Sequence, residues 1–121
     1  MPARNVAAAQ YRARPGVLRV SISRHLDFIH HAAAEQIDLL VFPELSLTDY
    51  GRAQAVSLAF PFTNDRLFPL QEAAVTHRIS IVAGMPLRLE QEVAIGFVDF
   101  LSGGSRVATL APAGIALGNW W

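Results

Sequence analysis

The residue best placed for chemistry in this sequence is Glu44. It follows a short apolar run, residues 38–42, and a proline, Pro43. If the run is a strand, Glu44 stands at its carboxyl end, where open α/β sheets place ligands and catalytic groups. A carboxylate half-buried at a strand end suits a general base near neutral pH, because desolvation raises the pKa of such a group. Position alone leaves a second interpretation open, in which Glu44 caps the following turn through backbone amides.

Two missing residue types limit the chemistry of these 121 residues. All 10 basic residues are Arg, so there is no Lys, and there is no Cys. Without Lys there is no P-loop lysine, no Schiff base and no lysine that stabilises an oxyanion. Without Cys there is no disulfide, no thiolate zinc site and no thiol nucleophile. Much enzyme chemistry is therefore excluded for these residues acting alone.

The histidines do not predict a metal site. They are His25, His30, His31 and His77. On a helix, the spacings of 5 and 1 between the first three do not align two ligands on one face, as spacings of 3 or 4 would. We therefore expect these three side chains on a helix surface and expect no bound metal.

Motifs for a cofactor or a serine nucleophile are also missing. No GxGxxG follows the first apolar run, and residues 103–107 lack the final glycine of a GxSxG nucleophile elbow. We expect no cofactor. Asp99, in an otherwise apolar segment, is expected to face a sheet edge or to pair with Arg106.

Composition indicates one soluble domain with an apolar contact surface. The length of 121 residues fits a single domain. Charged residues make up 17%, below the roughly 25% of an ordinary domain, so part of the surface is expected to pack against a partner. The net charge is zero and the arginines are scattered, which predicts no nucleic-acid partner. Because no secretory signal and no membrane span are visible, we expect a cytoplasmic protein that does not contact membranes.

The N-terminal part predicts a strand, a helix and a second strand. Residues 5–11 are mostly apolar and predict a strand that is buried on both faces. From about Val20, apolar residues at spacings of 4, 3, 4 and 4 predict a helix that Ser21 or Ser23 caps. That stripe consists of Ile22, Leu26, Ile29, Ala33 and Ile37. Residues 38–42 predict the second strand, and the βαβ order favours a parallel pair.

The next segment predicts a loop and then a further helix. Residues 45–50 read as a loop or short turn, and residues 53–59 as a short helix. Asn64 or Asp65 begins the next element, which has a proline in its first turn and ends near Arg78. Its expected apolar face is Leu70, Ala73, Ala74 and His77.

The last part predicts strands. Residues 79–84 predict a third buried strand, which completes a second crossover unit. Residues 93–101 and 106–110 predict a β-hairpin around a glycine-bearing loop, so the element order is βαβαβ followed by a hairpin. Residues 111–121 show no periodicity, and two interpretations stay open: an ordinary apolar tail, or a chain that is cut short or changed by a frameshift.

Three sequence blocks form a pattern that is similar to a known family. The most specific is FPEL at residues 42–45, followed by LTDY at residues 47–50, where the family more often has glycine in place of Asp49. The others are AAAE at residues 32–35 and AGMP at residues 83–86. Together they resemble the N-terminal part of the nitrilase, or carbon-nitrogen hydrolase, superfamily. The resemblance implies an αββα sandwich, of which this α/β chain would supply the N-terminal half.

The resemblance also implies a reaction and a role for Glu44. Members of this family use a Glu, Lys and Cys triad: the Glu takes the thiol proton, the thiolate attacks an amide or nitrile carbon, and the Lys stabilises the developing charge. Glu44 matches the general-base Glu. The Lys should follow the hairpin that ends near Leu110 and the Cys should come later, but Ala111 and Pro112 stand there instead.

The resulting expectation is a hydrolase of small amides or nitriles represented by an incomplete chain that is inactive by itself. Residues 1–110 would form a partial carbon-nitrogen hydrolase domain and residues 111–121 an irregular apolar tail. Family members associate through helices, which implies a homo-oligomer. The alternative is a non-catalytic remnant that acts as an interaction or oligomerisation module. A phospho-receiver domain is disfavoured because Gln10 and Tyr11 stand where paired acids are needed.

Overall fold

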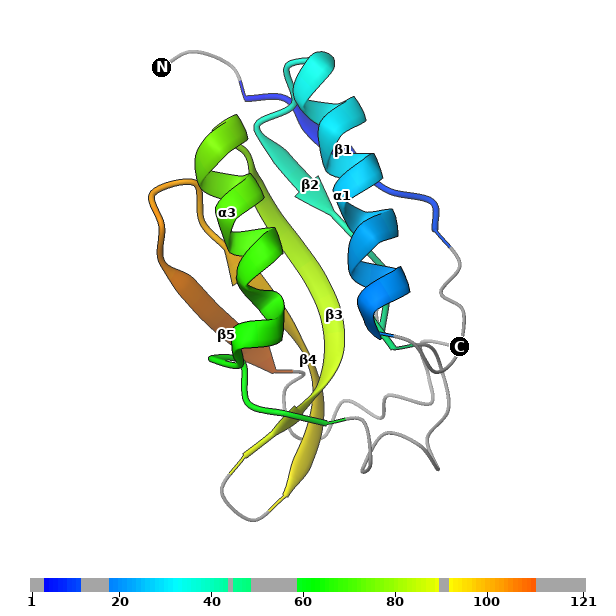
Figure 1. The fold of residues 1–121 in the computed structure, drawn as a ribbon, viewed down its shortest axis with the longest axis vertical. Coiled ribbons are helices and arrows are strands. Elements are labelled where there is room, and N and C mark those ends of the chain that lie inside the picture. Colours follow the sequence, from blue (N-terminus) through cyan, green and yellow to red (C-terminus); the bar gives the residue numbers. More distant parts are fainter. Residues whose placement is uncertain (1–3, 12–17, 44, 49–58, 90–91, 111–121) are drawn as a thin grey trace.

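A five-stranded sheet carries two α-helices on one of its faces (Figure 1). The computed structural model describes residues 4–11, 18–43, 45–48, 59–89 and 92–110. Within these ranges the chain has the α/β fold that the sequence predicts.

The sheet combines parallel and antiparallel strands. Its strands are β1 (Val6–Ala8), β2 (Leu39–Val41), β3 (Ser80–Arg88), β4 (Val93–Phe100) and β5 (Arg106–Leu110). They lie side by side in chain order. β1, β2 and β3 are parallel, while β4 is antiparallel to both β3 and β5. Both crossover units and the C-terminal hairpin are therefore confirmed.

Within the described ranges the helices are α1 (Leu18–Ala34), the 3₁₀ helix η1 (Asp65–Leu67) and α3 (Phe68–His77). Asn64 caps η1, because its side chain accepts a hydrogen bond of 2.9 Å from the backbone N–H of Arg66. A proline lies in the first turn of α3, and Arg78 ends that helix in the left-handed region with φ 55°. The predicted start and end of this helical segment are confirmed.

The predicted cap of α1 is wrong. The helix begins at Leu18, so Ser21 and Ser23 lie inside it. The buried carbonyl of Ser21 instead contacts a ring nitrogen of His25. At the other end, Gln36 turns the chain with φ 60°, and Ile37 therefore lies beyond the helix rather than on its stripe.

The core lies between the sheet and the helices. It includes Ile29 of α1, Leu70 of α3, and Ile81 and Phe100 of the sheet, all 0% exposed. Successive side chains of a strand point to opposite faces, and alternate residues of β3 accordingly enter this core. On the other face, where no described helix lies, residues such as Val82 and Phe97 are half-buried.

Two burial predictions fail at the margins of the sheet and of the helix layer. β1 is not buried on both faces, because it is an edge strand, and Val6 is 62% exposed. Only the side chain of Ala7 points from this strand into the core. His77, expected on the apolar face of α3, is exposed at the end of that helix.

No helix in the described ranges is long and apolar enough to cross a membrane.

Some predicted elements lie outside the described residues. They are most of the short helix at residues 53–59, the end of the loop at residues 49–50, and the segment at residues 111–121.

A substitution at Gly96 tests the contact between β4 and β5. An added Cβ at Gly96 would lie 2.6 Å from the backbone oxygen of Thr109 and 3.0 Å from side-chain atoms of Leu87 and Leu110. A backbone atom cannot move aside cheaply, so Gly96→Ala is expected to lower the free energy of unfolding by about 1–3 kcal/mol in urea titrations. Gly103→Ala is the matched control, because no atom lies within 4 Å of its added Cβ. Equal stability of the two variants would contradict the packing described here.

Candidate active site

The candidate site is the segment that follows β2. The backbone N–H of Phe42 donates to the carbonyl of Val82 at 2.8 Å, which continues the contact with β3 past the end of β2. After Pro43 the chain turns, and residues 45–48 are all buried. Glu44, the predicted general base, lies outside the described residues, so its side chain is not located. The site is therefore defined by what precedes and follows Glu44.

The turn after Glu44 has an unusual backbone conformation that several hydrogen bonds hold in place. Leu45 has φ 54°, in the left-handed region that bulky residues rarely adopt. The N–H groups of Ser46 and Thr48 donate to the carbonyls of Pro43 and Leu45, each at 3.1 Å. The N–H of Leu47 donates to the carbonyl of Gly84 in β3 at 2.9 Å. Backbone strain of this kind persists only where the surroundings enforce it, and it is common at functional sites.

A buried hydrogen-bond network ties this turn to both layers. His25 of α1 lies with Nδ1 2.7 Å from the carbonyl of Ser21 and Nε2 2.9 Å from Ser46 Oγ. A carbonyl only accepts, so Nδ1 carries the proton and Nε2 accepts from the Ser46 hydroxyl. Ser46 Oγ in turn accepts from the N–H of Gly84 at 3.1 Å. α1, the turn and β3 are thus connected through two side chains.

Aromatic rings surround this network. The ring of Phe42 stacks on that of His25, with centroids 4.1 Å apart. The ring of Tyr11 meets His25 edge-on at 5.0 Å, and the ring of Phe28 meets Phe42 edge-on at 5.8 Å. Edge-to-face and offset contacts of this kind are favourable for aromatic pairs. The residues on either side of Glu44 are therefore held by a packed support that contains the imidazole of His25.

Sequence reasoning placed His25 on the helix surface, and that prediction is wrong. The side chain of His25 is 0% exposed. Its position carried a signal: Ile22, His25 and Ile29 follow spacings of 3 and 4, which place all three on one helix face. The polarity of histidine outweighed that spacing in the prediction.

Acid is expected to destabilise the protein through His25. Burial lowers the pKa of His25 from 6.5 to about 4, against the opposing effect of the hydrogen bond to Ser21. The unfolded chain therefore binds this proton at a higher pH than the folded chain does. Stability is expected to fall by about 2–3 kcal/mol between pH 7 and pH 4.5, as measured by urea unfolding. His25→Gln should show less of this pH dependence, whereas exposed His31→Gln should keep it. If His25→Gln kept the full pH dependence of stability, the lowered pKa of His25 would not be its cause.

With this geometry established, the comparison with known proteins gives the family. The Carbon-nitrogen hydrolase family profile matches residues 5–108. The chain belongs to the carbon-nitrogen hydrolase family. The matched range covers β1 to β4, both α-helices and the first three residues of β5, and it includes the FPEL block.

Solved structures share this carbon-nitrogen hydrolase fold. One is a CN-hydrolase superfamily protein from Xanthomonas campestris that carries an arsenic adduct in its active site. It matches 98% of this chain at a TM-score of 0.83 and 16% identity. Another is a double mutant of the amidase from Nesterenkonia sp. AN1 in complex with acrylamide, with a TM-score of 0.75 and 19% identity over 88% of this chain. A third is a glutamine-dependent NAD(+) synthetase from Cytophaga hutchinsonii, with a TM-score of 0.66 and 21% identity over 98% of this chain.

This chain spans less than half of each of those structures. It covers 44% of the Xanthomonas protein, 42% of the amidase and 21% of the synthetase. The five-stranded sheet with its two helices therefore corresponds to a part of the carbon-nitrogen hydrolase fold.

The predicted pairing of Asp99 with Arg106 is wrong. In the ladder Asp99 lies opposite Val107 and Arg106 opposite Phe100, so the two side chains point to different faces of the sheet. Arg106 donates to the carbonyls of Phe62 and Asn64 at 2.9 and 3.2 Å. Asp99 accepts from the hydroxyl of Thr109 at 3.5 Å, and burial raises the pKa of the Asp99 carboxyl. Asp99 lies in β4, which is flanked by strands on both sides, and not at an edge of the sheet.

The other three histidines are not part of the hydrogen-bond network of His25 and Ser46 in the described residues. His30 and His31 are exposed on α1, as predicted. His30 and His77 come together across the two helices, with ring centroids 5.1 Å apart. The spacing of histidines along one helix gave no indication of this contact between two helices. The described residues include no group of three or more His, Cys, Asp or Glu that could hold a metal ion.

Proposed function

We propose that this chain supplies the general-base part of a carbon-nitrogen hydrolase that acts on a small amide or nitrile, with Glu44 as the base. The observation that carries the proposal is the family match across the strand, FPEL and turn of residues 38–48. The turn that follows Glu44 is buried and bonded to both α1 and β3. Such a support suits a carboxylate that must be held in one place during a proton transfer.

Similar structures support an amide as the substrate class. They include an amidase in complex with acrylamide, an N-terminal amidase with a Gln-Gly peptide and a glutamine-dependent NAD(+) synthetase. In the proposed reaction, Glu44 takes the proton of a Cys thiol and the thiolate attacks the amide carbon. The leaving nitrogen takes that proton from Glu44 as the C–N bond breaks, so ammonia or an amine departs, and water then hydrolyses the acyl-enzyme to a carboxylic acid. A Lys stabilises the negative charge on the carbonyl oxygen.

Residues 1–121 hold neither that Cys nor that Lys. We therefore propose that these residues do not catalyse hydrolysis by themselves and that the nucleophile belongs to polypeptide outside them. Residues 1–110 would be a partial hydrolase domain and residues 111–121 an irregular apolar segment. A cytoplasmic location, a homo-oligomer and the absence of nucleic-acid and membrane partners complete the proposal.

The nucleotide sequence beyond codon 121 provides the test. All reading frames are searched for a Lys codon soon after the hairpin and a Cys codon further along. The protein that joins residues 1–121 to this downstream sequence is then expressed. Release of ammonia from a panel of short amides and nitriles is then measured. The proposal expects hydrolysis of at least one member of the panel. Unrelated sequence in every frame, or a joined protein with an intact Cys and no hydrolysis, would contradict it.

A second candidate function is a non-catalytic interaction module. Both helices lie on one face of the sheet, and no described element covers the other face (Figure 1). On that face Val6 is 62% and Val107 is 47% exposed, and an apolar surface of more than a few hundred Å² commonly marks a contact. Size-exclusion chromatography with light scattering tests the module. A monomer with cooperative unfolding contradicts it, whereas a stable oligomer agrees both with the module and with the homo-oligomer proposed for the hydrolase.

A further inference from the structure

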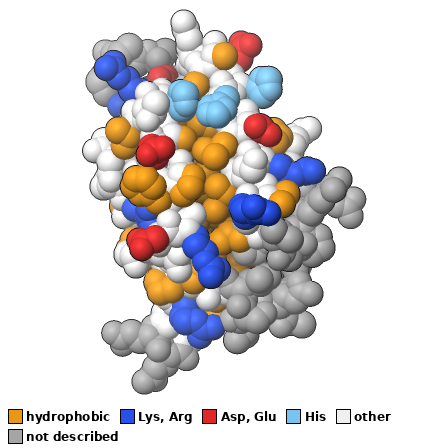
Figure 2. Space-filling model, in the orientation of Figure 1, with side chains coloured by type: hydrophobic (Ala, Val, Ile, Leu, Met, Phe, Trp, Pro, Cys, Tyr) orange, Lys and Arg blue, Asp and Glu red, His pale blue; other side chains and the backbone are white. Residues whose placement is uncertain are grey.

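The pair His30 and His77 is a feature that hydrolysis does not use. His30 lies near the end of α1 and His77 is the last residue of α3. In Figure 2, the histidine side chains gather at one end of the helix-bearing face. Both side chains are exposed, and their rings contact each other with centroids 5.1 Å apart and planes at 68°. Two imidazoles from different helices are therefore close together and open to solvent.

We propose that His30 and His77 bind one divalent transition-metal ion of the Zn²⁺, Ni²⁺ or Cu²⁺ class between α1 and α3. Imidazole nitrogen is a preferred ligand for these three metals. Metal–nitrogen bonds of about 2.0–2.1 Å at a tetrahedral angle put the centroids of two ligating rings about 5 Å apart. The observed centroid separation of 5.1 Å is close to that value, and because the rings meet edge-to-face at 68°, both exposed rings must rotate to turn a nitrogen toward a shared ion.

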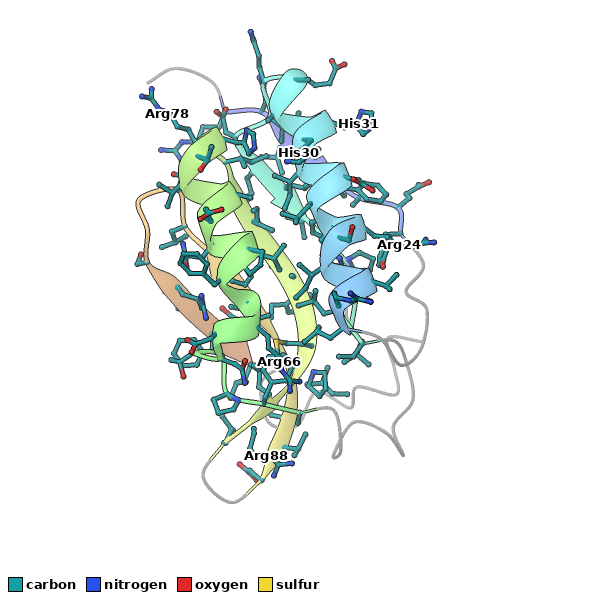
Figure 3. All side chains as sticks on the ribbon, in the orientation of Figure 1. Arg24, His30, His31, Arg66, Arg78 and Arg88 are labelled. Carbon is teal, nitrogen blue, oxygen red and sulfur yellow. The ribbon has the colours of Figure 1, made fainter. Side chains whose placement is uncertain are left out.

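The local electrostatics favour a cation at this place. α1 ends at Ala34 and α3 at His77, so the C-termini of both helices lie near the pair. A helix C-terminus carries a partial negative charge, and two such ends attract a cation. Asp27 lies one turn before His30 on α1 and adds an acidic group on that helix. Arg78, which follows His77 in the chain, extends away from α1 (Figure 3).

The site has two protein ligands. No third His, Cys, Asp or Glu joins His30 and His77 within the part of the chain that the structure describes. Water molecules would therefore fill the remaining coordination positions. His31 follows His30 directly but lies on the other side of α1, away from α3 (Figure 3). It is the matched control, because it is an exposed histidine of the same helix turn that contacts no other aromatic ring among the described residues.

Isothermal titration of the protein without a polyhistidine tag tests the proposal. Zn²⁺ and Ni²⁺ are titrated separately at pH 7.5. We expect one metal ion per chain, and we expect His30→Ala and His77→Ala each to weaken binding at least about tenfold. The double variant should bind no more weakly than the weaker single variant, because one ligand cannot chelate. His31→Ala should leave the affinity within about twofold.

Thermal unfolding supplies a second measurement. A metal ion that links α1 to α3 binds the folded chain alone, so Zn²⁺ is expected to raise the Tm by several degrees. That shift should vanish in His30→Ala and in His77→Ala and persist in His31→Ala. Exposed substitutions of this kind leave the fold intact, which circular dichroism checks. The proposal fails if no metal binds, if either single variant binds as well as the wild type, or if His31→Ala loses the same affinity.

Discussion

Replacing Glu44 by Gln is expected to lower kcat/KM for amide hydrolysis about 10³-fold in a protein that joins residues 1–121 to the missing Lys and Cys. A Gln side chain cannot accept the thiol proton, so the Cys stays largely in its unreactive protonated form. Positioned bases contribute about 10²–10⁴-fold to rate, and members of a catalytic triad act as one unit. The measurement is ammonia release at subsaturating amide.

Two controls separate this effect from misfolding. Glu35→Gln changes an exposed carboxylate beyond α1 and should keep kcat/KM within about twofold. Alkylation of the active-site Cys by iodoacetamide should slow in Glu44→Gln in parallel with hydrolysis, because both depend on thiolate. If Glu44→Gln retained full hydrolysis, Glu44 would not be the base, and the cap interpretation of this residue would stand.

The largest loss of stability is expected from Phe42→Ala. Phe42 is 1% exposed, and its ring stacks on His25 and meets Tyr11 and Phe28 edge-on. Removing the ring leaves a cavity directly before the candidate site, at a cost of about 3–5 kcal/mol in the free energy of unfolding. Urea unfolding at pH 7 provides the value.

Phe68→Ala is the matched control, because Phe68 is 57% exposed and its loss should change stability by less than about 0.5 kcal/mol. Phe42→Leu retains much of the buried volume and should cost about 1 kcal/mol, so it remains measurable if Phe42→Ala does not fold. Similar losses in Phe42→Ala and Phe68→Ala would show that the aromatic cluster does not support the site.

Local patterns predicted much of the fold. The apolar run at residues 38–42 and the helical spacing of Ile22, Leu26 and Ile29 depend on neighbours along the chain, and β2 and α1 follow them. Asn64 and Arg78 mark helix ends through their own backbone and side-chain chemistry, so those ends were also predictable. The FPEL block at residues 42–45, together with AAAE at residues 32–35 and AGMP at residues 83–86, was enough to indicate the family.

Features that depend on tertiary contacts were not predictable in this way. β3 was expected to stop at Gly84, but it continues to Arg88 because β4 pairs with it along its whole length. Pro86 fits there because β2 pairs with β3 only as far as Val82, so fewer backbone donors are needed beyond that point. Proline and glycine in a sequence do not reveal that the pairing with β2 stops at Val82 and that the turn at Leu47 and then Phe60 contact this edge of β3 instead.

The candidate site was likewise predictable from local sequence but not in its tertiary contacts. FPEL identified the position of Glu44, yet the hydrogen bonds among His25, Ser46 and Gly84 join segments that are far apart in the sequence. A polar ring inside the core becomes predictable only when its partners are known, since burial without hydrogen bonds would be unfavourable. The contact of His30 with His77 likewise depends on how α1 and α3 pack.

The central claim is that Glu44 serves a thiol nucleophile that residues 1–121 do not contain. Purified residues 1–121 are incubated with short amides and nitriles across pH 5–9, and ammonia is measured for the wild type and for Glu44→Gln. We expect no release above buffer from either protein and no adduct with a thiol-alkylating reagent. Hydrolysis by the wild type that disappears in Glu44→Gln would contradict this claim, because the carboxylate would then activate water without any thiol.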